Sequence, residues 1–458
     1  MKLSRWLILF LALLSAGLLT GAGLTILDTA DQVTIQREVL AGDPDAADNV
    51  ELTLPLSCGD QLFWVTTFPA GQPEEAETAF SSSLTRSFYA PTWEGTPLSV
   101  EIDSYHNVYD SVWESFAEQV WEATPIGEKR TYTYLLTDYF DAWPLSVSAD
   151  SKYDLPDGRL KELFQSYFSI PIPEGTQISI TVERSSSGAS YFYDANIPML
   201  GSCTAVQGDC VIFALCNSDT VSDGLDTDHP VTLDDSQIPG GWGIYRYTPN
   251  EARTDGTIET LWSLPEESIV QDFWGAEDGK EFFLLTREDD QLRLRIFDEN
   301  VHLVQTLDLL PFSDAETYMQ VYKGDGFLVP IVYGPRAENY CNRFAVVSRQ
   351  PEGWVLAFTG DDREADALEH GGFSWTHDSR HSLDMVFDGQ RLAIRDSSTY
   401  DSNPFSLAVY SKDGLEYLAD YYSSVAQSAN VLNSTFSLSH VQTSWIEEQT
   451  IRWAETSS

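Results

Sequence analysis

Residues 269–310 read IVQDFWGAEDGKEFFLLTREDDQLRLRIFDENVHLVQTLDLL, and this stretch decides the fold. It holds four short runs rich in β-branched, aromatic and aliphatic residues, separated by Gly, Asp and Asn residues typical of turns. Runs this short are typical of strands rather than of helices. The strands expected here are Ile269 to Trp274, Phe282 to Thr286, Arg293 to Asp298 and Val304 to Leu310. Short consecutive strands joined by tight turns predict an antiparallel sheet.

The same order of strands recurs twice after this stretch and once before it. The second repeat comprises Tyr318 to Tyr322, Phe327 to Tyr333, Arg343 to Ser348 and Trp354 to Thr359. The third comprises Leu383 to Phe387, Arg391 to Arg395, Ser406 to Tyr410 and Glu416 to Tyr421. A looser, earlier copy starts at Ile197 and continues through Val211 to Cys216, Gly243 to Tyr247 and Thr257 to Leu264. Four strands in every roughly 50 to 60 residues is the spacing of propeller blades.

The N-terminal half fits this pattern less regularly. One blade is expected from Glu51 to Leu56, Gln61 to Thr66, Ser87 to Ala90 and Leu98 to Ile102. Another is expected from Thr131 to Leu136, Leu145 to Ser148, Phe168 to Ile172 and Gln177 to Glu183. Two helical insertions interrupt these strands, because apolar residues recur there at helical spacing. The first places Tyr109, Val112, Trp113, Phe116 and Val120 on one face, and the second starts after Pro156 with Leu160, Leu163, Phe164 and Tyr167. Both aromatic stripes are interpreted as packing faces.

This layout resembles a β-propeller, most clearly over residues 197–422. The resemblance is to the architecture alone, because no WD dipeptide recurs and the kelch-like pairs Gly240-Gly241 and Gly371-Gly372 are isolated. Residues Ser411 to Gly414 also lack the residue that separates Asp from Gly in the Asp-box of sialidase-like blades. The resemblance implies an all-β, β-propeller-like fold of about seven four-stranded blades, with six or eight as alternatives. No family's active site can be transferred to this chain.

Strands from both ends of the chain are expected to close the ring. The tail after Val431 offers three strands, which do not complete a blade, at Thr435 to His440, Thr443 to Ile446 and Thr450 to Trp453. Residues Val33 to Val39 alternate between the two faces of a strand and are predicted to pair with this C-terminal sheet. Such closure removes exposed sheet edges, which promote aggregation.

The chain opens on a charged N-terminus followed by a long apolar segment. Lys2 and Arg5 precede Trp6 to Leu27, which contains no charged residue. A helix needs about 20 residues to cross the hydrocarbon core, and basic residues favour the cytoplasmic side. This charge distribution predicts export of the bulk of the chain. A cleaved signal peptide is the alternative interpretation, with a weak site at Gly21 to Gly23.

These features divide the chain into expected regions. Residues 1–5 form the cytoplasmic N-terminus, residues 6–27 a transmembrane anchor or uncleaved signal, residues 28–49 a lead-in with the ring-closing strand, and residues 50–458 an extracytoplasmic propeller-like domain. The predicted localisation is the cell membrane, with a single pass and the C-terminal domain outside.

The chain is strongly acidic without being of the disordered type. It carries 26 Lys and Arg against 71 Asp and Glu, a formal net charge of −45. A surface of this sign repels phosphate backbones, so nucleic-acid binding is excluded. Its 13 Trp, 21 Tyr and 23 Phe residues exceed what disordered acidic segments contain. The acidic charge is interpreted as keeping the surface solvated. The functional alternative is that it attracts cations or a basic partner.

The five cysteines are Cys58, Cys203, Cys210, Cys216 and Cys341. Because the count is odd, at least one has no partner within the chain. The spacing of the central three matches no zinc motif, and an apolar run joins Cys210 to Cys216, so these are interpreted as buried thiols of the core. Cys341 is predicted to be unpaired and buried at the start of a strand.

Two groups of polar residues are candidate metal sites. His370, His377 and His381 lie close together, but the segment lacks helical periodicity and the Glu of a zinc-protease motif. The second group is an acidic loop that lacks the order and the bidentate Glu of an EF-hand; its carboxylates are Asp223, Asp226 and Asp228. Both are interpreted as polar surface loops, and no metal or other cofactor is expected.

Two hypotheses about function remain. The first is a non-catalytic, membrane-anchored module that binds or senses an extracellular protein or glycan. The second is an extracellular carbohydrate-active hydrolase or lyase, because its paired carboxylates would come from distant strands and leave no local motif. The chain contains no Gly-x-Ser-x-Gly elbow, Walker loop or dinucleotide motif, so the binding module is preferred. No catalytic residue is assigned.

The charge distribution around residues 6–27 generates a prediction about topology. A protease added to intact cells should remove an epitope placed after Ser458, because the bulk of the chain is expected outside. Immunoblotting before and after cell lysis measures this. Removal only after lysis would reverse the predicted orientation.

Overall fold

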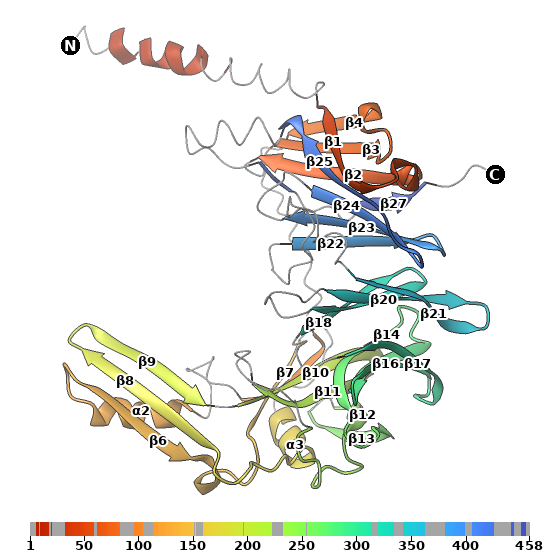
Figure 1. Ribbon diagram of the computed structural model, residues 1–458. Coiled ribbons are helices and arrows are strands. Elements are labelled where there is room, and N and C mark those ends of the chain that lie inside the picture. The colour runs from red at the N-terminus through yellow and green to blue at the C-terminus, as the bar shows by residue number, and fades with distance from the viewer. Residues whose placement is uncertain are drawn as a thin grey trace. The chain divides into compact units, whose positions relative to one another are not determined.

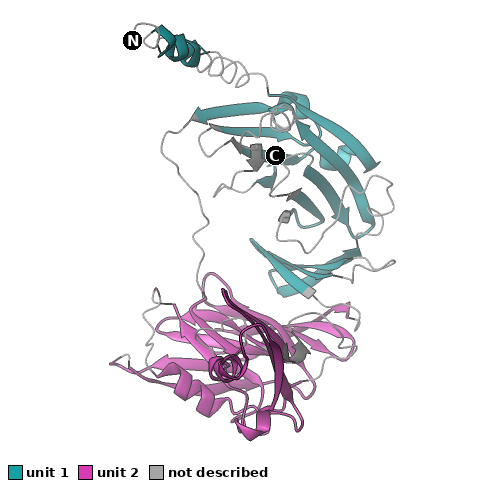
Figure 2. Cartoon of the chain, turned by 90° about the vertical axis from the view of Figure 1, so that its left-hand side faces the viewer, with its two compact units in different colours: residues 1–93, 318–458 teal, residues 94–317 magenta. Residues whose placement is uncertain are grey.

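The computed structural model shows a chain built mainly of β-strands (Figure 1). The residues it describes are 6–8, 10–17, 20, 33–58, 62–82, 96–103, 113–150, 152, 159–195, 197–221, 232–252, 254–312, 318–333, 342–361, 381–398, 405–425, 441–443 and 450–454. They fall into two compact units (Figure 2): residues 1–93 with 318–458, and residues 94–317.

The five-stranded sheet of the first unit contains the predicted third repeat. Its order is β1-β25-β24-β23-β22. The bounds are β1 Ile35–Gly42, β22 His381–Phe387, β23 Arg391–Ser398, β24 Phe405–Ser411 and β25 Gly414–Ser423. Every residue of β24 is buried, as expected for a strand covered on both faces.

A four-stranded sheet in the same unit confirms the predicted second repeat. Its strands follow in chain order, as β18 Tyr318–Gly324, β19 Phe327–Tyr333, β20 Arg343–Gln350 and β21 Gly353–Asp361. All seven residues of β19, FLVPIVY, are buried. A Pro within a strand removes one backbone donor, and Pro330 lies opposite Val321 of β18.

The third sheet of this unit joins strands from the two ends of the chain. Its strands are β2 Val50–Cys58, β3 Leu62–Pro69, β4 Glu77–Ser82, β26 Val441–Thr443 and β27 Ile451–Trp453. Both C-terminal strands pair antiparallel with β2, at opposite ends of its length. Short 3-10 helices η1 Pro44–Ala47 and η2 Pro73–Glu75 precede β2 and β4 respectively.

The second unit contains the two repeats that begin at residues 197 and 269. The first sheet comprises β10 Pro198–Gln207, β11 Cys210–Val221, β12 Gly243–Pro249 and β13 Gly256–Ser263. The next comprises β14 Ile269–Gly275, β15 Glu281–Glu288, β16 Gln291–Asp298 and β17 Leu303–Pro311. Asn217, fully buried, joins them: its amide donates to the Ser268 carbonyl at 3.0 Å and accepts from the Val270 amide at 2.9 Å.

The remainder of the second unit departs from the predicted blades. It contains β5 Leu98–Ile102 paired with β7 Leu145–Ala149, and a sheet β6-β8-β9 with bounds Lys129–Leu135, Gln177–Ser185 and Gly188–Ala195. The blade placing Leu98 to Ile102 beside β2 and β3 is therefore wrong, as is the blade that joins Leu145 to Ser148 with β6 and β8. Residues Phe168 to Ile172 contain no strand; two of these side chains, Phe168 and Ile170, are fully buried.

Both predicted helical insertions are present in this unit. They are α2 Glu114–Ala123 and α3 Leu160–Tyr167. Phe116 and Val120 of α2, and Leu160 and Phe164 of α3, are buried, which confirms the predicted packing faces. Tyr109 and Val112, assigned to the first helix, lie outside the described residues. A 3-10 turn, η3 Leu136–Asp138, follows β6.

The strand predicted at Val33 to Val39 is paired with a strand of the C-terminal half. Its partner is β25 rather than a strand of the tail after Val431. β1 joins β25, with Ile35 opposite Ser423 and Val39 opposite Ala419. It therefore does not supply a fourth strand to the tail after Val431, whose described strands pair with β2 instead. The predicted alternation is confirmed at its centre: Ile35 is buried and Arg37 half-buried, whereas Gln36 and Glu38 are exposed.

Arg37 lies on the inner face of β1, where its charge requires polar partners. Its Nη1 donates to the carbonyl oxygens of Ala70 and Gly71, at 3.2 and 2.8 Å. Tyr421, directly opposite Arg37, donates to the same Ala70 carbonyl at 2.9 Å. An arginine on the inner face is tolerated because its guanidinium satisfies backbone acceptors at the end of β3.

The predicted membrane segment is described only in part. Residues 6–8, 10–17 and 20 are helical. Among the described residues, none of the helices combines the length and the apolar character that crossing a membrane requires.

Arg37→Met tests the link between β1 and the end of β3. The substitution keeps the alkyl stem but removes the donor to the Gly71 carbonyl and leaves Tyr421 as the side-chain donor to the Ala70 carbonyl, so we expect it to destabilise the protein by about 1–3 kcal/mol. Thermal unfolding measures this as a lower melting temperature. Gln36→Met, on the exposed face of β1, is the control and should change the melting temperature little; an equal effect of both would contradict the role of Arg37.

Candidate functional site

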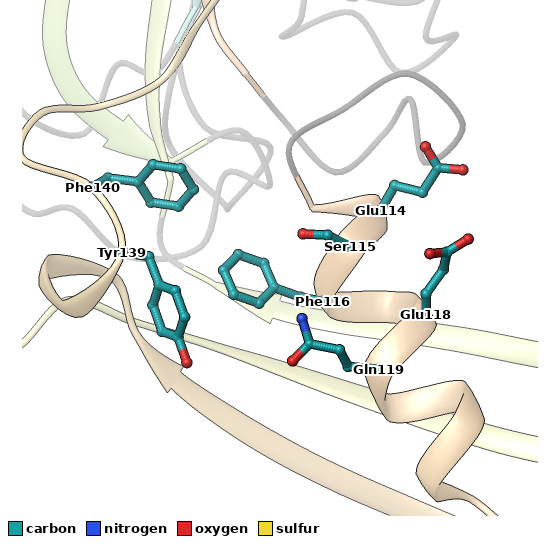
Figure 3. Close-up of a pocket in the computed structure, with 7 residues that line it drawn as sticks. All are labelled: Glu114, Ser115, Phe116, Glu118, Gln119, Tyr139 and Phe140. Atoms are coloured by element: carbon teal, nitrogen blue, oxygen red, sulfur yellow. The ribbon is translucent and has the colours of Figure 1, made fainter.

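A groove lies beside helix α2 in the second unit (Figure 3). Its volume is about 580 Å³. The lining side chains are Glu114, Ser115, Phe116, Glu118, Gln119, Tyr139 and Phe140. They come from α2 and from the segment that follows η3, so the groove combines aromatic rings with carboxylate and amide groups.

Helix α2 is held in place by its apolar face. Phe116, Ala117 and Val120 are buried on it. They belong to the same core cluster as Ile178 and Ile180 of β8, the strand that α2 contacts most. Burying the apolar side of an amphipathic helix on a sheet leaves its polar side exposed, which places Glu118 and Gln119 at the surface.

Two arginines donate hydrogen bonds to backbone carbonyls at the C-terminal end of α2. Arg184 donates to the carbonyls of Trp121 and Thr124 at 3.3 and 3.0 Å, and Arg130 donates to that of Ala123 at 2.9 Å. The Arg184 guanidinium also lies 4.0 Å from the centre of the Trp121 ring. The last carbonyls of a helix lack intrahelical donors and carry partial negative charge, so these cations stabilise the helix end.

A cluster of rings forms the apolar part of the groove. Phe116 lies at its centre, with the ring of Tyr139 at 4.8 Å and 87° and that of Phe140 at 6.3 Å and 77°. Edge-to-face contacts of this kind fix ring orientation. Phe116 is 3% exposed whereas Tyr139 is 54% exposed, so the Tyr139 ring is accessible from solvent. Burial raises the pKa of the neighbouring Tyr134.

The polar part of the groove comes from one side of α2. Glu114 and Glu118 are four residues apart and therefore neighbours on the helix surface. Within the described part of the chain, neither forms an ion pair with a Lys, Arg or His side chain. Figure 3 shows both carboxylates on one flank of α2, while Gln119 extends toward Phe116 and Tyr139.

The sequence interpretation missed this groove. It assigned Phe116 to a packing face, which is correct, but Tyr139 and Phe140 follow the 3-10 turn η3 and show no periodicity. The only available signal was the density of aromatic residues over Tyr132 to Phe140, read together with the spacing of Glu114 and Glu118.

The metal candidates lie almost wholly outside the described residues. His370, His377, Asp223, Asp226 and Asp228 all fall there, and His381 is described only as the first residue of β22. Among the described residues, no three His, Cys, Asp or Glu side chains are placed to hold a metal ion.

Cys203, Cys210 and Cys216 are free thiols on one sheet. The Sγ atoms of Cys203 and Cys216 lie 3.8 Å apart, and Cys210 Sγ lies 3.4 Å from Thr248 Oγ1. The contact with Cys216, together with burial, raises the pKa of Cys203, which keeps this thiol protonated and unreactive. Cys341 lies outside the described residues.

Three carboxylates, at two places in the structure, bear on the hydrolase hypothesis. Asp396 and Asp420 flank Ser406 across β23, β24 and β25, and Ser406 donates to Asp420 at 2.6 Å. Burial raises the pKa of Asp420, a property that suits a general acid. Both aspartates, however, are only 5% exposed, so a polysaccharide cannot reach them without rearrangement.

The third carboxylate is that of Glu288 in β15, which binds two arginines. Its Oε1 lies 2.5 Å from Arg295 Nη1, and its other oxygen binds Arg293. Burial by itself raises the pKa of Glu288. The bonds to Arg295 and Thr286 outweigh this effect, so the pKa is lowered to about 2. A carboxylate held ionised in this way stabilises the sheet and cannot donate a proton near neutral pH.

Comparisons with known proteins leave the family open. No family model and no curated protein match the chain. A solved structure from Bacteroides uniformis, named after 6-phosphogluconolactonase, is 12% identical, with 81% of this chain and 95% of that chain covered and a TM-score of 0.28. The WD40 domain of SCAP from fission yeast is 10% identical, with coverages of 81% and 76% and a TM-score of 0.25. TolB from Acinetobacter baumannii is 10% identical, with 86% and 81% covered and a TM-score of 0.17. These scores are too low to transfer a function.

Arg184→Met tests what holds the helix of the groove. It removes the bonds to two carbonyls and the stacking on Trp121, so we expect a loss of about 1–2 kcal/mol and faster hydrogen exchange across α2. Hydrogen-exchange mass spectrometry measures the local effect. Arg246→Met, which removes one exposed ion pair with Glu259, is the control and should leave α2 unchanged. Unaltered exchange in the Arg184 variant would contradict this role.

Proposed function

We propose that this chain is a membrane-anchored, extracytoplasmic binding module that holds an extracellular partner in the groove beside α2. The observation that carries the proposal is the groove itself, where an exposed tyrosine lies near two acids that form no ion pair among the described residues. Exposed aromatic residues beside polar groups are the usual anchors of recognition surfaces.

The anchor and the scaffold belong to the same proposal. Residues 6–27 form the membrane segment, supported by the charge-free run and by Lys2 and Arg5 before it. The four-stranded sheets form a propeller-like scaffold, supported by the regular repeat over residues 197–422. A single anchor carrying a large acidic domain is suited to presenting a binding surface outside the cell.

Binding is favoured over catalysis by the chemistry of the groove. Its carboxylates, Glu114 and Glu118, lie on the rim beside water rather than in an enclosed cleft. The buried Asp420, whose pKa is raised, lies in β25 and is 5% exposed. The two properties that a glycosidase needs, an accessible pair and a protonated acid, are thus found at separate places.

The intact protein in detergent, applied to arrays of extracellular glycans and of peptides, tests this function. Tyr139→Ala should weaken binding of any retained ligand about fivefold or more, as expected for an exposed aromatic anchor. Phe192→Ala is the matched control, because Phe192 of β9 is 53% exposed and does not line the groove. Equal losses in both variants, or cleavage of a retained glycan, would contradict a binding role for this site.

A further inference from the structure

Resting on the proposed function, we infer that the ligand of this groove is a basic polypeptide segment with at least two cationic side chains. One cation stacks on the ring of Tyr139, and the other meets the paired carboxylates of Glu114 and Glu118. The chemical class recognised is thus Lys or Arg side chains rather than neutral sugars.

The carboxylate pair supplies the first half of the argument. Two acids at i and i+4 repel each other across one helix flank, at a cost of a few tenths of a kcal/mol. Within the described residues no Lys, Arg or His forms an ion pair with either of them, whereas Glu128, Glu259 and Glu288 of the same unit each have an arginine partner. An external cation removes the repulsion and occupies the flank.

The ring of Tyr139 supplies the second half. It is 54% exposed, and its contact with Phe116 at 87° holds its orientation. A cation over an aromatic face gains about 0.5–1 kcal/mol at an exposed site. Gln119 extends toward this ring, so its amide oxygen can accept a hydrogen bond from the bound ammonium or guanidinium group (Figure 3).

The positions of these groups require more than one cation. Figure 3 shows Glu114 and Glu118 on the flank of α2 that faces away from Tyr139, with Gln119 on the other side. A single ammonium group cannot contact the ring and both carboxylates at once. A segment lying across α2 can contact both, and its alkyl stems cover the helix surface between them.

The charge of the whole chain favours the same class of ligand. A net charge of −45 concentrates cations near the surface and repels sulfated or phosphorylated chains. A neutral glycan would use Tyr139 and Gln119 but has no need of two adjacent carboxylates. The pair therefore distinguishes a basic segment from a sugar.

Fluorescence anisotropy with the intact protein in detergent tests the inference at about 0.15 M salt. The probes are a labelled, otherwise neutral peptide with two lysines, the same peptide with both lysines acetylated, and a labelled neutral oligosaccharide. We expect the lysine peptide to bind and acetylation to abolish binding. Tyr139→Ala should weaken it about fivefold.

Matched double variants separate local recognition from general attraction. Glu114→Gln with Glu118→Gln should weaken peptide binding about five- to tenfold. Glu162→Gln with Glu174→Gln removes the same charge from exposed positions outside both the groove and α2, and should weaken it less than twofold. Circular dichroism confirms that each variant is folded.

The remaining outcomes overturn different statements. Equal losses in the two double variants, or binding of the acetylated peptide, would overturn the inference about cations. The inference would also be overturned if the oligosaccharide binds, Tyr139→Ala abolishes this binding, and Glu114→Gln with Glu118→Gln preserves it. That result would leave the proposed function in place. If Tyr139→Ala changes the binding of no probe that is retained, the groove is not a binding site and both fail.

Discussion

The need to pair the edge of every buried sheet is the constraint on which the rest of this structure depends. An unpaired edge presents free amide and carbonyl groups, which are costly when buried and prone to aggregation when exposed. In the first unit, β1 covers β25, and both C-terminal strands cover β2. Gly42 shows how closely β1 fits, because it ends the strand at a φ of +78° where a Cβ atom would overlap the Glu416 carbonyl.

Buried polar side chains then fix which sheets lie side by side within each unit. In the second unit, the fully buried Asn217 bonds both to Ser268 and to Val270, so it specifies the junction between β11 and β14. In the first unit, Arg395, 2% exposed, bonds to Asp384 at 3.2 Å and to Thr450 at 2.7 Å, which ties the start of β27 to β22 and β23. Apolar contacts alone would tolerate several strand registers. A buried amide or guanidinium tolerates few, because a change of register would take away its hydrogen-bond partners.

The sequence predicts the strands of the repeats well and their distant partners poorly. Over residues 197–422 each strand pairs with its neighbour in the chain, so turn residues and alternation suffice to identify the sheet. Leu98 to Ile102 pairs instead with Leu145 to Ala149, across an inserted helix, and no local pattern specifies such a partner. The same reason explains the tail, since a strand pattern at Ile451 does not reveal that β2 is its partner. The groove was missed because it joins a helix to a turn without periodicity.

The position of the groove follows from these rules of packing. Ile178, Ile180 and Val182 make one face of β8 apolar, and α2 buries its own apolar face in the same cluster. This leaves the acids of α2 facing water on the helix flank that points away from Tyr139, on a part of the second unit that lies outside the four-stranded repeats. The net charge of the chain acts over about a Debye length and raises the encounter rate of any cation, but it does not discriminate among cations. Discrimination requires groups at fixed separations. A helix with arginines at its C-terminal end and rings held edge to face supplies that rigidity, and a flexible acidic loop with the same charge would not.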